Sequence, residues 1–69
     1  MEVFGERIKK LRESKGFTQR QLAKEIGFVH SAIALWESNN RTPSLEVAKV
    51  FAKYFNVSID YLAGLTDKK

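Results

Sequence analysis

Residues 19–38 read QRQLAKEIGFVHSAIALWES, a stretch that predicts two helices joined by a tight turn. Helices that cross closely need a small residue at the crossing, which Ala23 supplies. Four positions later the turn needs a residue that readily adopts positive φ, and Gly27 meets that need. Ile33 and Trp36 give the second helix an apolar face, because residues three apart lie on one side of a helix. Its opposite face is therefore free for a partner.

The same pattern also fits a plain pair of antiparallel helices within a bundle. Three further apolar positions, Leu22, Ile26 and Phe28, are filled in register and favour a helix-turn-helix at about residues 18–38. Residues 18–21, TQRQ, form a capping box in which a threonine and a glutamine three positions later satisfy each other's backbone amides. The stretch therefore predicts a second helix that is presented to another molecule.

Shorter apolar patterns on both sides predict three more helices. Before the stretch, Phe4, Ile8 and Leu11 fall at i, i+4 and i+7, and this amphipathic helix ends near Gly16. After it, residues 42–44, TPS, open a fourth helix, and a serine before the last apolar pattern caps a short fifth one. The apolar positions of the last two helices are Leu45, Ala48, Phe51, Ala52, Phe55, Ile59, Leu62, Ala63 and Leu65.

Length and composition fit one compact all-α domain. The chain has 69 residues, of which 43% are hydrophobic, and leaves room for a single core. We expect one helix-turn-helix domain over residues 1–69, with its core at about 4–66 and a polar, frayed tail at 66–69. Since no cysteine is present, disulfides and thiolate-bound metals are excluded. The sequence has neither a membrane-length apolar run nor a signal peptide, so we expect a cytoplasmic protein.

The charge is positive and unevenly placed. The net charge is +4, and residues 1–41 hold eight basic and five acidic side chains, a balance of +3. This balance favours a polyanionic partner that is contacted by the N-terminal half. The alternative is that the net charge serves only solubility, since small domains often lie a few charges from neutrality. Charge alone does not distinguish these two explanations.

Four segments together resemble one family. They are IKKLRESKG at 8–16, FTQRQLAKEIG at 17–27, WESNNRTPS at 36–44 and SIDYLAGL at 58–65. Along roughly residues 4–66 the chain is similar to the lambda-repressor/Cro-like (XRE-type) helix-turn-helix family. The resemblance implies a lambda-repressor-like fold and a transcriptional regulator, frequently dimeric, whose partner is double-stranded DNA.

The resemblance assigns base contacts to the outward face of the second helix of the motif, the recognition helix. In the family, the positions of His30 and Ser31 commonly read base edges, and that of Leu35 often does so one turn later. His30 can donate to guanine O6 or N7, whereas Ala34 and Leu35 offer only apolar contact, such as with a thymine methyl. The alternative for His30 is an ordinary exposed histidine.

The resemblance also assigns phosphate contacts. Gln19 opens the first helix of the motif, where free amides and the helix dipole favour an anion. Arg20, Asn40 and Arg41 flank the recognition helix and are the other candidates, although Arg20 is equally well explained as a solvated charge. Such contacts fix the register on DNA without reading its sequence.

In the family, a pair at the positions of Arg12 and Glu37 joins the first helix to the end of the recognition helix. We interpret this pair as structural.

Two positions depart from the family pattern. Val29 stands where a helix-capping Ser or Thr is usual, and a lost cap of this kind costs on the order of 1 kcal/mol. Asn39 stands where Gly is usual, and Asn also tolerates positive φ. Together with its alanines and Leu35, Val29 makes the recognition helix unusually apolar. The main alternative to DNA binding is therefore a protein-interaction module that keeps the fold.

No site for chemistry is evident. The only histidine lies on the recognition helix, and the sequence contains no glycine-rich phosphate loop and no metal-ligand cluster. We therefore expect no enzyme activity, no cofactor, no metal and no small-molecule ligand. We do expect a homodimer. A group of C-terminal side chains either contributes to the dimer interface or extends the core around the fifth helix. These side chains are Val47, Val50, Tyr54, Tyr61 and Leu65.

Overall fold

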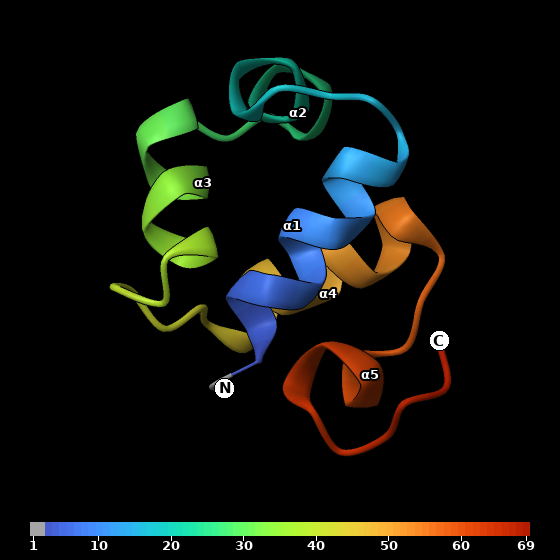
Figure 1. Cartoon of the computed structure of the whole chain (residues 1–69). Coiled ribbons are helices and arrows are strands. Elements are labelled where there is room, and N and C mark those ends of the chain that lie inside the picture. Colours follow the sequence, from blue (N-terminus) through green and yellow to red (C-terminus); the bar gives the residue numbers. More distant parts are fainter. Residues whose placement is uncertain (1–2) are drawn as a thin grey trace.

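The computed structural model describes residues 3–69, which form five helices and no strand (Figure 1). The helices are α1 (Phe4–Ser14), α2 (Gln19–Ile26), α3 (His30–Glu37), α4 (Leu45–Phe55) and α5 (Ile59–Ala63). In Figure 1, α2 and α3 lie at one side of the molecule and α5 at the other, with α1 between them. The all-α, five-helix prediction is confirmed.

Side-chain N-caps begin α2, α4 and α5, as the sequence predicts. Thr18 Oγ1 accepts from the amide of Gln21 at 3.1 Å, and Gln21 Oε1 accepts from the amide of Thr18 at 2.7 Å. Ser44 and Ser58 cap α4 and α5 with their hydroxyl oxygens alone, which accept from the amides of Val47 at 3.2 Å and Tyr61 at 2.9 Å. Val29 is the N-cap of α3 and contributes no side-chain hydrogen bond. The tight turn between α2 and α3 depends on Gly27, whose φ is +80°.

The core is centred on Phe51 of α4. Its ring contacts Phe4 at 5.5 Å, Trp36 at 5.8 Å and Phe28 at 6.0 Å between ring centroids. Edge-to-face aromatic pairs add to the free energy that burial contributes. Trp36 is thus a core residue that anchors α3 to the rest of the molecule.

The group proposed as a dimer surface is divided in the structure. Three of its members, Val47, Tyr54 and Tyr61, pack against the core and are half-buried. Val50 and Leu65 are exposed, with 39% and 78% of their surface accessible. The core interpretation is confirmed for these three side chains, and Val50 and Leu65 remain candidates for a dimer interface.

The end of α3 approaches α1 closely. The amide of Gly5 donates to Asn39 Oδ1 at 3.1 Å. A Cβ atom on Gly5 would lie 2.6 Å from the carbonyl oxygen of Glu37, and closer still to that of Trp36. Asn39 has a φ of +61°, so it adopts the backbone conformation expected of it and adds a hydrogen bond that glycine cannot make.

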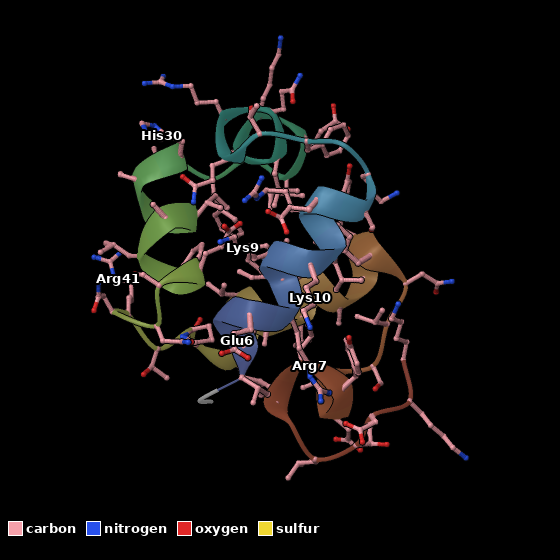
Figure 2. The ribbon with its side chains drawn as sticks, viewed as in Figure 1. Glu6, Arg7, Lys9, Lys10, His30 and Arg41 are labelled. Carbon is pink, nitrogen blue, oxygen red and sulfur yellow. The ribbon has the colours of Figure 1, made fainter. Side chains whose placement is uncertain are left out.

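The C-terminal tail differs from the expectation of a frayed segment. Arg7 Nη1 donates to the carbonyls of Tyr61 and Thr66, each at 2.6 Å, and Nη2 pairs with Asp67 at 2.9 Å. The amide of Ser58 donates to the carbonyl of Lys69 at 2.8 Å. Figure 2 shows Arg7 extending from α1 toward α5. The tail is held because one arginine binds two of its oxygens, those of Thr66 and Asp67, a pairing that the polar composition of the tail does not reveal.

Candidate nucleic-acid interface

The inward face of α3 anchors the helix and leaves the other face outward. Ala32, Ile33 and Trp36 are buried. Of the predicted base-reading residues, Ser31 is exposed, whereas His30, Ala34 and Leu35 are half-buried. Figure 2 shows His30 at the end of α3 that adjoins α2.

Val29 is the most exposed apolar side chain beside this face, with 68% of its surface accessible. The outward surface is therefore as apolar as the sequence indicates, and Ser31 is the exposed polar residue among the four predicted to read bases.

The phosphate candidates lie at two places. Arg20 is exposed in the first turn of α2, and Asn40 and Arg41 are exposed in the turn after α3. Both amides of that turn donate to the carbonyl of Leu35, at 3.0 Å from Asn40 and 3.2 Å from Arg41, and so fix its backbone. In Figure 2, Arg41 lies beyond the opposite end of α3 from His30. Positive charge thus stands in the elements that flank α3.

Arg12 and Glu37 form a buried ion pair between α1 and α3. Arg12 Nε lies 2.6 Å from Glu37 Oε2, and Nη2 lies 2.9 Å from Oε1. The side chains are 10% and 4% exposed. Hydrogen bonding to Glu37 raises the pKa of Arg12 and outweighs burial, which lowers it. Arg12 Nη1 also donates to the carbonyl of Phe17 at 2.6 Å, so one guanidinium fixes α1, the turn before α2 and the end of α3.

Gln19 has a contact that the sequence analysis did not foresee. Its Nε2 donates to Glu37 Oε1 at 3.1 Å, and the side chain is half-buried. No spacing rule links residues 18 positions apart on different helices, so the sequence holds no signal for this bond. A second unforeseen contact, between Gly5 and Asn39, has a weak signal, namely a glycine placed within a helical pattern.

The part of the chain that the structure describes shows neither a metal site nor a membrane-spanning helix. Within residues 3–69, no three histidine, aspartate or glutamate side chains come together in a way that could hold a metal ion. None of the helices described is long and apolar enough to cross a membrane.

The sequence model of the helix-turn-helix family matches residues 8–62. The chain belongs to the helix-turn-helix family. It is 39% identical to the uncharacterized HTH-type transcriptional regulator YazB of Bacillus subtilis. The alignment spans 62 residues and covers 90% of each chain. This match confirms the family that the sequence motifs resemble.

Other relatives in the family are longer. The regulator YobD of Bacillus subtilis is 34% identical over 94% of this chain and 58% of its own length. The HTH-type transcriptional activator BcrR of Enterococcus faecalis is 41% identical over 86% of this chain and 29% of its own length. The chain therefore matches 29% of the length of BcrR and 58% of the length of YobD.

A solved structure confirms the fold. The P22 c2 repressor, in complex with a synthetic operator, superposes with a TM-score of 0.78 and 34% sequence identity, over 86% of this chain and 89% of that one. The lambda-repressor-like arrangement is thus shown for this member of the helix-turn-helix family.

Proposed function

We propose that this chain is a sequence-specific DNA-binding transcriptional regulator, acting as a repressor with α3 in the major groove. The observation that carries the proposal is the anchoring of α3 by Ile33 and Trp36, which leaves its other face outward in a fold shared with an operator-bound repressor. A major groove about 12 Å wide admits a helix of this kind. The regulator would work in the cytoplasm and needs no cofactor.

Base reading is assigned to four residues on the outward face of α3. His30 donates to guanine, and Ser31 donates or accepts at a base edge. Ala34 and Leu35 contact thymine methyl groups, for which an apolar surface is suited. Because few polar groups are available, DNA shape supplies part of the specificity.

Phosphate binding is assigned to the two places that flank α3. At the start of α2, Gln19 and Arg20 lie where the helix leaves backbone amides without intrahelical acceptors. On the other side, Asn40 and Arg41 contact the backbone from the turn that the Leu35 carbonyl fixes. These residues set the register of α3 on the duplex.

A homodimer on a two-fold operator completes the proposal. Two recognition helices would lie about 34 Å apart, one turn of duplex. Val50 and Leu65 are exposed apolar side chains that a second copy could cover. Sedimentation at micromolar concentration measures this directly, with a dimer as the expected result.

Binding to a labelled duplex at several salt concentrations tests the function. We expect tight binding at low salt that weakens steeply with added salt, because phosphate contacts release counterions. Arg41→Ala should weaken binding to all sequences alike and flatten the salt dependence. His30→Ala should instead change which sequence is preferred.

The apolar outward face favours one second candidate, a protein-interaction module without DNA binding. The observation that favours this candidate is the exposure of Val29, an apolar side chain that is 68% exposed at the start of α3. Steep, salt-dependent binding to duplex DNA would exclude this module.

A further inference from the structure

Glu37 is a buried carboxylate that connects the two DNA-facing helices of the proposed site. It is 9% exposed, so it lies too deep to contact a duplex itself. Its Oε1 accepts from both Arg12 Nη2, at 2.9 Å, and Gln19 Nε2, at 3.1 Å. Residues of α1, α2 and α3 therefore converge on one oxygen atom.

The chemistry of the two groups fixes which way the Gln19 amide faces. A carboxylate only accepts hydrogen bonds, so the amide must present its nitrogen, and not its oxygen, to Glu37. That nitrogen carries two N–H groups in one plane. With one of them bound to Glu37, the second is directed elsewhere and is still available to an acceptor.

The position of this amide suggests the acceptor. Gln19 is the first residue of α2, whose capping box occupies the amides of Thr18 and Gln21. The backbone amides of Gln19 and Arg20 are left without intrahelical acceptors and favour an anion. The second N–H of the side chain stands at this same helix end.

We infer that Glu37 is a positioning residue for DNA binding, because it orients the Gln19 amide so that its second N–H donates to a phosphate. This inference rests on the proposed function. Arg12 makes the orientation rigid, since it binds both oxygens of Glu37. Because Glu37 ends α3, the same carboxylate ties the phosphate contact of α2 to the placement of the recognition helix.

A double-mutant cycle of Glu37→Gln and Gln19→Ala tests the inference. The probe is a fluorescently labelled 20-base-pair duplex of mixed sequence at low salt, and the readout is its Kd. Hydrogen bonds to charged groups are worth enough that Gln19→Ala should weaken binding by about tenfold. In Glu37→Gln, the amide at position 37 can present either its oxygen or its nitrogen to Gln19, so the orientation is no longer fixed. The substitution should weaken binding by about three- to tenfold in the natural chain, and by less than about twofold in the Gln19→Ala background.

The cycle separates this coupling from other effects of the lost charge. Freeing Arg12 changes the electrostatics equally in both backgrounds, so it cancels in the comparison. Gln21→Ala is the matched control, since it removes a glutamine of the same helix that faces Thr18 and not Glu37. Glu37→Gln should keep its full effect in that background. An equal effect of Glu37→Gln with and without Gln19 would overturn the inference.

A second measurement does not depend on the folding of Glu37→Gln. In the natural chain, the two side-chain amide protons of Gln19 are followed by NMR as the same duplex is added. We expect the proton that is not bonded to Glu37 to shift and its partner to move much less. If the duplex binds but neither proton shifts, the inference is wrong. If no duplex binds at low salt, the proposed function itself fails.

Discussion

Gly5 allows the end of the recognition helix α3 to pack closely against α1. Any side chain there would meet backbone oxygens at the end of α3, because a Cβ would lie 2.6 Å from the Glu37 carbonyl oxygen and closer still to that of Trp36. Backbone atoms cannot move aside as the end of a flexible side chain can. The close approach of α1 and α3 therefore requires glycine.

Gly5→Ala should lower the free energy of unfolding by about 1–3 kcal/mol, the usual range for overpacking. Urea unfolding followed by the fluorescence of Trp36 measures it. The matched control is Gly16→Ala, where no atom lies within 4 Å of the added Cβ and only the positive φ of +72° opposes it. The packing argument would be contradicted if Gly5→Ala were the milder of the two substitutions.

Tyr54 gives the stability a dependence on alkaline pH. Desolvation, followed by the charge of Glu25 and a hydrogen bond from the Tyr54 hydroxyl to it, raises the pKa of Tyr54 above its ordinary value. The folded state thus keeps its proton where the unfolded state releases it. The stabilisation is present below pH 10 and is lost as the pH rises through the folded-state pKa.

Between pH 9 and pH 11, the natural chain should therefore lose more stability than Tyr54→Phe, which has no proton to release at this position. Chemical unfolding at the two pH values measures the difference. An identical loss in both proteins would show that Tyr54 does not contribute.

At the scale of the elements, the four helices that follow α1 differ in how they begin. Side chains cap α2, α4 and α5, whereas α3 begins without a side-chain cap. Val29 has the extended backbone of an N-cap, with φ −78° and ψ 146°, but no oxygen to accept from the first turn. Val29→Thr should therefore stabilise the protein by about 0.5–2 kcal/mol, the range for such caps. Thermal unfolding measures the gain.

Val29→Ala is the control for this prediction, because it removes the exposed valine without adding an acceptor. It should leave the stability nearly unchanged. Equal stability of the threonine and alanine variants would contradict the capping argument.

The elements themselves were predictable because their signals are local. The capping box of Thr18 and Gln21 and the turn at Gly27 span a few residues each, and the structure confirms both. The contacts of Gln19 with Glu37 and of Arg7 with the tail were not predictable. They join residues 18 to 60 positions apart, and neither helical periodicity nor composition records such pairs.

At the scale of the whole molecule, α1 contacts two structures at opposite sides of the domain. Its Arg12 binds the end of α3, and its Arg7 binds the tail and stacks over the Tyr61 ring at 4.2 Å. The recognition helix and the C-terminal segment are thereby held to one common element.

Arg7→Ala should release the tail and leave α3 in place. The amide of Ser58, which donates to the Lys69 carbonyl, should then exchange with solvent faster, because the tail that protects it is no longer held. Hydrogen exchange measured by NMR tests this, with Lys10→Ala, an exposed lysine of the same helix, as the control. Unchanged protection of Ser58 in Arg7→Ala would contradict the assignment.

The central claim is that this domain reads DNA sequence through the outward face of α3. Selection of bound duplexes from a random pool tests it most directly. We predict one recurring motif with two-fold symmetry, its half-sites about 10 base pairs apart, bound at least about 10³-fold more tightly than a shuffled duplex. Recovery of no motif, with equal affinity for selected and shuffled duplexes, would contradict the claim.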